Sequence, residues 1–187
     1  MVARASALAT CTMTWTAEAK MKSHNVGVAA EAFVAAQFAR LGFDVSVQYG
    51  ANQPEYDLIV ARGDLLLKVS VKGSQDGSWG LTQSFLKKGK ANYHDAIDTW
   101  LKRHGSKTVF CFVQFSDVPE DSVPRMYLAT PSEVAIRLRE TSGGRGDSIL
   151  YERHQWTSRS RTAAGIVEEI PPNWKLSEAR IHELLSK

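Results

Sequence analysis

The sequence contains no apolar run that approaches the length needed to cross a bilayer, which argues against a membrane protein. It also lacks a large excess of one charge, because the formal net charge is only +3. Such a mild balance permits contact with phosphates but does not by itself indicate nucleic acid. The choice of partner therefore has to come from the motifs.

Cysteine is scarce, since only Cys11 and Cys111 are present, far apart and without the spacing of a zinc site. Cys111 lies within an apolar strand pattern, so we expect a buried free thiol there. Cysteine usage of this kind fits a reducing compartment, and we expect the protein to be cytoplasmic.

The first twenty residues follow no helical or strand pattern of their own. Arg4 precedes a short apolar stretch at 5–9, but four threonines between positions 10 and 16 then interrupt it, which argues against a signal peptide. We expect residues 1–20 to form a peripheral arm and residues 21–187 to form one domain. A chain that begins at Met21 should then keep the melting temperature of the full chain.

The composition is that of a packed domain: 187 residues, of which 43% are hydrophobic and 23% are charged. Hydrophobic periodicity predicts the order helix, three strands, helix, two strands, helix, with one more helix at the end. The expected helices cover residues 25–41, 93–101 and 131–139, with the last one after Ser177, and the expected strands cover 43–49, 56–61, 65–72, 108–115 and 126–129. This order indicates an α/β domain whose sheet is covered by helices on both faces.

Local signals mark where some of these elements begin. Asn25 and Asn92 are candidate helix caps, and Thr130 opens the sequence of a capping box. The segment 73–80 is polar and glycine-rich, so we expect a loop there, and the segment 149–170 is a candidate hairpin.

Four residues on the first helix and on the second and third strands carry the chemistry. Glu31 lies beside the apolar stripe of the first helix, where a carboxylate is costly unless it has a partner such as a metal or a lysine. Asp57 stands near the start of the second strand. Ser70 and Lys72 are two residues apart on the third strand, so they point to the same face. Carboxylates hold a hard cation that polarises a phosphate and acidifies water, and a neighbouring lysine balances the developing negative charge.

These residues resemble the PD-(D/E)xK nuclease superfamily. The segments Ala30-Glu31, Tyr56-Asp57-Leu58-Ile59 and Val71-Lys72-Gly73 are similar to the core motifs of archaeal Holliday-junction resolvases. The resemblance implies a single restriction endonuclease-like domain with a mixed central sheet, and cleavage of DNA that depends on Mg²⁺ or Mn²⁺. It further implies that Asp57 is the central metal ligand, that Glu31 binds the metal directly or through water, and that Lys72 orients the nucleophile.

The sequence departs from this pattern at Ser70, where the superfamily has aspartate or glutamate. A serine does not supply the negative charge that holds the cation, although some members of the superfamily bring the missing carboxylate from elsewhere. The candidates here are Asp76, Asp95 and Glu55, of which Asp76 is nearest in sequence.

Polar and basic side chains after the third strand are candidates for contact with DNA. Gln75 and Gln83 could reach phosphate or base edges, and Trp79 could stack on a base or anchor the loop. Lys87 and Lys88 begin a basic cluster that would suit a phosphate backbone or simply form a solvated surface.

We therefore expect a metal-dependent endonuclease that acts on DNA, with a homodimer as one option for its assembly. The alternative is a nuclease fold that has lost its activity with Ser70 and binds nucleic acid or a protein partner. An acidic site that binds Mg²⁺ or Mn²⁺ favours the first, whereas a salt bridge between Lys72 and Asp57, with no third carboxylate near, favours the second.

Overall fold

A mixed five-stranded sheet forms the centre of the computed structural model, which describes residues 20–48, 55–86, 92–105, 107–157, 160 and 163–186. The strands are β1 (Asp44–Val47), β2 (Leu58–Arg62), β3 (Leu65–Ser74), β5 (Thr108–Gln114) and β6 (Arg125–Ala129), and their order in space is β1-β2-β3-β5-β6. Only β3 and β5 run parallel among these neighbours. A parallel pair needs a long crossover connection, and the segment that contains α2 (Tyr93–Leu101) supplies it.

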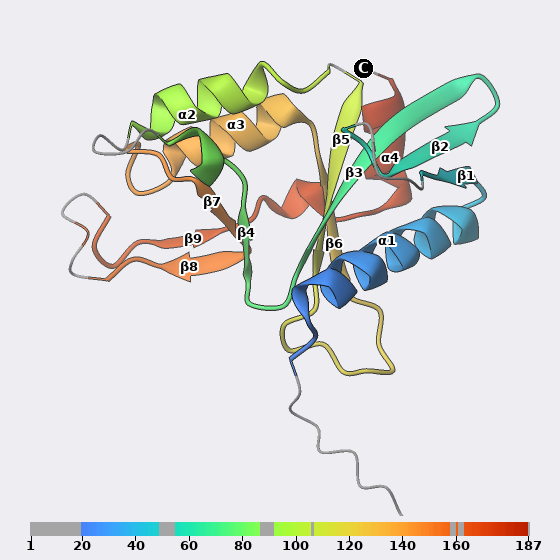
Figure 1. Ribbon diagram of the computed structural model, residues 1–187, viewed down its shortest axis with the longest axis horizontal. Coiled ribbons are helices and arrows are strands. Elements are labelled where there is room, and N and C mark those ends of the chain that lie inside the picture. Colours follow the sequence, from blue (N-terminus) through green and yellow to red (C-terminus); the bar gives the residue numbers. More distant parts are fainter. Residues whose placement is uncertain are drawn as a thin grey trace, which may run out of the picture.

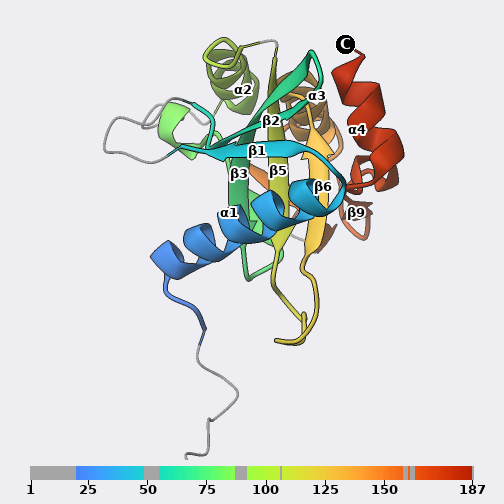
Figure 2. The ribbon, with the colours of Figure 1, turned by 90° about the vertical axis from the view of Figure 1, so that its right-hand side faces the viewer.

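Helices cover both faces of the sheet, which confirms the predicted single α/β domain. In Figure 1, α1 (Ser23–Arg40) and α4 (Glu178–Leu185) lie on one side of the sheet, and α2 and α3 (Pro131–Glu140) lie together on the other. Figure 2 shows α1 running across the first of these faces. Two hydrophobic cores result, one on each side of the strands.

Strand β5 separates the two cores, and all its residues are buried. Its odd-numbered core residues Val109, Cys111 and Val113 pack toward α1 and α4, whereas Phe110 and Phe112 pack toward α2 and α3. This strand is apolar throughout because both of its faces are covered. Cys111 is a buried free thiol, as predicted.

The capping predictions are confirmed at two helices and wrong at one. The Asn92 side chain accepts the N–H of Asp95, and Thr130 and Glu133 form a reciprocal capping box. Helix α1, however, begins at Ser23, so Asn25 lies inside the helix and does not cap it. The earlier start follows from a distant contact, because the Gln75 side chain bonds both the N–H and the C=O of Met21.

The predicted loop at 73–80 is also partly wrong, because β3 continues to Ser74 and β4 (Ser78–Gly80) follows. The pairing partner of β4 is β7 (Ile149–Tyr151), which lies much later in the chain. Trp79 is only 3% exposed, with its ring 5.3 Å from that of Phe112. A core position of this kind removes the Trp79 ring from any base that it could stack on, so its predicted place in a DNA interface is corrected.

The C-terminal region carries the predicted hairpin, in which β8 (Arg153–Gln155) pairs with β9 (Val167–Glu169) in antiparallel fashion. Two 3-10 turns complete the described elements, at Gln83–Phe85 and Pro172–Trp174. Within the parts of the chain that the structure describes, no helix combines the length and the apolar character that crossing a membrane requires.

A candidate active site where two strands part

The site begins where β2 leaves β3. The ladder between the two strands ends at the pair Leu58 and Val69, so the N–H of Val71 lies beyond the last backbone partner. The Asp57 side chain takes that place, with its Oδ2 accepting the Val71 N–H at 2.6 Å. The Asp57 N–H in turn donates to Val69 O at 2.9 Å, and its carbonyl accepts from Gln48 N at 2.9 Å. Asp57 is thereby held at the fork between the strands.

Ser70 and Lys72 share one face of β3, as the two-residue period requires. Across the parallel ladder they lie beside Phe110 and Phe112 of β5. Ser70 is 2% exposed, and its hydroxyl lies 3.5 Å from Asp57 Oδ2. Lys72 is half-buried, and it takes part in no ion pair among the described residues. The salt bridge between Lys72 and Asp57 that would close the site is therefore not formed.

Glu31 approaches the fork from helix α1, which packs on the other face of the sheet. The helix lies very close to β3 at Gly73, where an added Cβ would stand 2.8 Å from Val26 O and 3.0 Å from the Ala30 Cβ. Burial is the largest cause that raises the pKa of Glu31, and the Asp57 carboxylate raises it further. The ammonium of Lys72 acts in the opposite direction and lowers this pKa. Glu31 thus lies close enough to Asp57 and Lys72 for their charges to act on it, although α1 packs on the face of the sheet opposite to that of Ser70 and Lys72.

Of the three acids considered as substitutes for the missing carboxylate at position 70, two are engaged elsewhere. Asp76 Oδ1 accepts the Ser74 hydroxyl at 2.9 Å and two bonds from Ser78, which lower its pKa against the opposing effect of burial. Glu55 Oε1 accepts the Thr108 hydroxyl at 2.6 Å and the Gly105 N–H at 3.1 Å. Asp95 is an exposed residue in the first turn of α2.

Glu31 and Asp57 therefore remain as the candidate carboxylates near the fork. Over the described ranges, no group of three or more histidine, cysteine, aspartate or glutamate side chains is placed to hold a metal ion. Mg²⁺ is commonly bound through one or two protein carboxylates together with substrate phosphates and water. Glu31 and Asp57 offer oxygen donors of the kind that such a cation takes.

One neighbour of the site carries no signal in the sequence. His104 follows α2, and its Nδ1 lies 3.6 Å from Glu55 Oε2. Burial, the largest cause, lowers the pKa of His104, while Glu55 opposes this effect and Lys72 adds to it. His104 thus lies near enough to Lys72 for the two charges to interact, although the residues belong to different elements.

The residues predicted to contact DNA are not gathered at one place. The Gln75 side chain is occupied by the backbone of Met21, whereas Gln83 is exposed in the 3-10 turn at 83–85. Lys87 and Lys88 lie outside the described residues.

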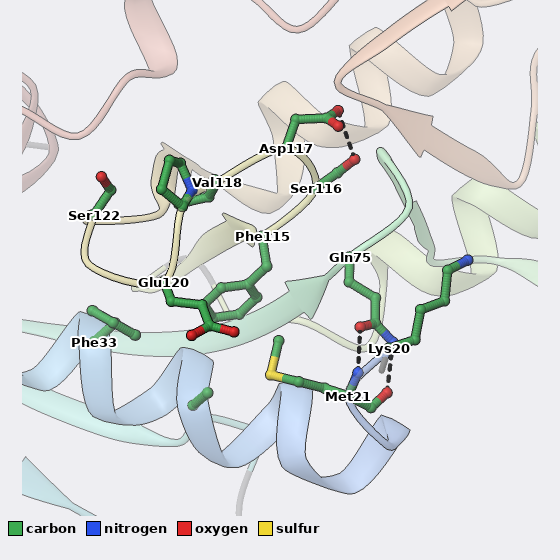
Figure 3. A pocket seen from close by; sticks show the side chains of 12 residues that line it. Lys20, Met21, Phe33, Gln75, Phe115, Ser116, Asp117, Val118, Glu120 and Ser122 are labelled. Carbon is green, nitrogen blue, oxygen red and sulfur yellow. Dashed lines mark hydrogen bonds between the residues drawn. The ribbon is translucent and has the colours of Figure 1, made fainter. Parts of the chain in front are cut away.

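A cavity of about 530 Å³ opens at a different place, beyond the C-terminal ends of β3 and β5. Figure 3 shows Phe33, Phe115 and Met21 at its base and the carboxylate of Glu120 at its side. None of the four candidate residues at the fork lines this cavity.

The sequence and the structure were compared with those of known proteins. No family model matches the sequence, and no curated protein does. Among solved structures, the chain is similar to a bacterial homing endonuclease, I-Ssp6803I, with a TM-score of 0.43 and 14% identity over 87% of this chain and 93% of that chain. Because a fold does not determine an activity, the function has to be argued from the site itself.

Proposed function

We propose that this protein is a metal-dependent endonuclease that cleaves phosphodiester bonds of DNA. The observation that supports the proposal is that two carboxylates, Glu31 and Asp57, lie within electrostatic reach of each other and of Lys72, which has no ion-pair partner in the described chain. A carboxylate pair beside an available ammonium suits a reaction in which negative charge develops on a phosphate.

Each residue has a distinct part in the proposed reaction. Asp57 Oδ1 and Glu31 hold the cation, which when bound polarises the phosphate and lowers the pKa of its water. The bond from Val71 N–H to Asp57 Oδ2 fixes the carboxylate so that Oδ1 keeps one direction. Lys72 donates to the attacking water or to a phosphate oxygen and balances the charge that develops there.

The PD-(D/E)xK superfamily is the family that we propose for this site, with Ser70 in the position of its second acid. Ser70 is buried beside Asp57, so its hydroxyl can hold the Asp57 carboxylate but adds no charge. We expect Mg²⁺ or Mn²⁺ to bind weakly to the protein alone and more tightly with DNA present, because phosphate oxygens complete the coordination.

The direct test is incubation of the purified full chain with single-stranded, duplex and branched DNA in the presence of Mg²⁺ or Mn²⁺. Cleavage of at least one substrate, abolished by a chelator, is expected. An absence of cleavage on all three substrates, together with no metal binding by calorimetry with or without DNA, would overturn the proposal that the protein is an endonuclease.

A binding module that has lost its activity is the second candidate. The observations in its favour are the serine at position 70 and the lack of a third metal-ligating side chain near Glu31 and Asp57 among the described residues. This candidate predicts DNA binding that does not change when Mg²⁺ is added, whereas the endonuclease predicts tighter binding with Mg²⁺.

Changes at Ser70 test whether the site lacks a carboxylate. We expect Ser70→Ala to alter cleavage only a few-fold, because the hydroxyl carries no charge. Ser70→Glu should lower the melting temperature in a chelator, since a buried carboxylate beside Asp57 is costly. Mg²⁺ should then raise the melting temperature of the variant again, because a tenfold gain in affinity for Mg²⁺ adds about 1.4 kcal/mol to the stability of the metal-bound protein.

Ser74→Glu is the matched control for this experiment. Ser74 lies on the same strand and is also buried, but its hydroxyl bonds Asp76 and not Asp57. The added charge is the same, so the stability of Ser74→Glu should respond to Mg²⁺ no more than that of the unaltered chain. An equal Mg²⁺ response in the two glutamate variants would contradict the placement of the cation at the fork.

A further inference from the structure

A second cavity, of about 270 Å³, lies between three segments that are far apart in the sequence. It is lined by Tyr93 at the start of α2, by Arg145 and Asp147 in the loop after α3, and by Trp156 just after β8. In Figure 1 these ends lie together on the left, while β1 and β2 lie on the right. The lining therefore combines two aromatic rings with one guanidinium and one carboxylate.

The Asp147 carboxylate is held in place by the backbone on one side only. Its Oδ1 accepts the N–H of Ser148 at 2.6 Å and the N–H of Ile149 at 3.2 Å. No donor from the described residues reaches Oδ2. Burial is the largest cause that raises the pKa of Asp147, so the charged carboxylate is only partly compensated by the protein. A ligand with an N–H group would supply the missing donor.

Two aromatic rings that come shortly before Trp156 in the chain support it at the cavity. Tyr151 stacks on His154 with 4.2 Å between ring centroids, and His154 meets Trp156 edge-on at 4.5 Å. The Nε1–H of Trp156 is buried and has no acceptor among the described residues. The face of an aromatic ring that lines a cavity suits a flat ligand that can stack on it, and nucleobases are such ligands.

We propose that this cavity binds one nucleobase that carries an amino group, from DNA in which that base is unpaired. Asp147 Oδ2 accepts the amino N–H, the rings of Tyr93 and Trp156 contact the base, and Arg145 binds the adjoining phosphate. Cytosine, adenine and guanine offer an amino group, whereas thymine presents a carbonyl at the corresponding position of cytosine. Only a base outside the duplex stack can enter a cavity, so the ligand is a single-stranded or extruded nucleotide. The inference rests on the proposed function, because it names a second contact with the same DNA.

Asp147→Asn tests the acceptor with little change of shape. The asparagine Oδ1 can still accept the two backbone N–H groups, while the oxygen Oδ2 becomes an NH₂ donor. Binding is measured by fluorescence anisotropy without divalent cations, on deoxycytidine and deoxythymidine homopolymers of about 12 nucleotides, within the range of single-strand site sizes. The unaltered chain should bind the cytosine polymer at least about fivefold more tightly, and Asp147→Asn should remove or reverse this preference.

Glu120→Gln is the matched control, since it removes the same charge at the other cavity. It should strengthen binding to both polymers equally and leave their ratio unchanged, whereas Arg145→Gln should weaken both. An unaltered chain that does not distinguish the polymers, or a ratio that is the same in Asp147→Asn, would overturn the inference. The assay involves no cleavage. A chain that cleaves DNA but shows no preference for the cytosine polymer therefore overturns only the proposal that the cavity binds a nucleobase. A chain that prefers the cytosine polymer but cleaves no DNA overturns only the proposed endonuclease activity.

Discussion

Asp57→Asn is expected to reduce Mg²⁺-dependent cleavage by about a thousandfold or more while leaving the protein folded. The cation loses its central anionic ligand, and an amide oxygen does not replace that charge. The asparagine Oδ1 can still accept the Val71 N–H that Asp57 Oδ2 accepts at 2.6 Å. Asp57→Ala removes this acceptor as well, which should cost about 1–3 kcal/mol of stability. Initial cleavage rates and urea unfolding measured on the same samples separate the two effects.

Lys72→Met completes this test from the other side of the fork. Cleavage should fall as severely as in Asp57→Asn, but Mg²⁺ should still bind in the presence of DNA, because the lysine acts on water and phosphate and not on the metal. Lys68→Met is the control for the loss of a lysine on the same face of β3. Asp44→Asn is the control for the loss of a carboxylate, because Asp44 on β1 is exposed and lies outside the site. Cleavage that survives in Asp57→Asn or Lys72→Met would contradict the proposed mechanism.

Gly73→Ala should damage the site without altering any of its four residues. The new Cβ would stand 2.8 Å from Val26 O and 2.9 Å from Val26 Cγ1, so helix α1 has to move away from β3. Overpacking of this kind costs about 1–3 kcal/mol. Because Glu31 moves with the helix, a shift on the order of 1 Å should lower the cleavage rate about a hundredfold.

Gly27→Ala is the matched control on the same helix. A Cβ added at Gly27 meets no atom within 4 Å, so the change only removes the conformational freedom of a glycine inside a helix. It should stabilise the fold by up to about 1 kcal/mol and leave cleavage intact. If Gly73→Ala cleaves at the normal rate, the position of α1 does not control the site.

The elements that local sequence signals predict are those whose stabilising contacts are also local. Asn92 caps α2 and the Thr130 capping box opens α3, because each involves residues only three positions apart. Strand β5 was predicted from its continuous apolar run, which reflects burial on both faces. Strand β4 has no such signal, since it is short and its partner β7 comes much later in the chain.

The start of α1 illustrates the same limit. Asn25 has the side chain of a good cap, but the helix extends to Ser23 because Gln75, distant in the sequence, binds the backbone of Met21. Val26 is also buried against the sheet, so the first turn is stabilised by packing. A tertiary contact here outweighs a local preference.

The sequence by itself determined which residues form the candidate site and on which elements they lie, because Glu31, Asp57, Ser70 and Lys72 stand in short motifs that resemble those of a nuclease superfamily, and the periods of short segments give their elements. Only the tertiary structure decided that Asp57 replaces a lost strand partner of Val71 and that Lys72 forms no ion pair in the described chain. It also decided that the carboxylates of Glu55 and Asp76 accept hydrogen bonds from Thr108 and Ser74. The physical reason is that these contacts depend on where β2 parts from β3 and on how closely α1 packs at Gly73, and both are set by segments that meet only in the folded chain.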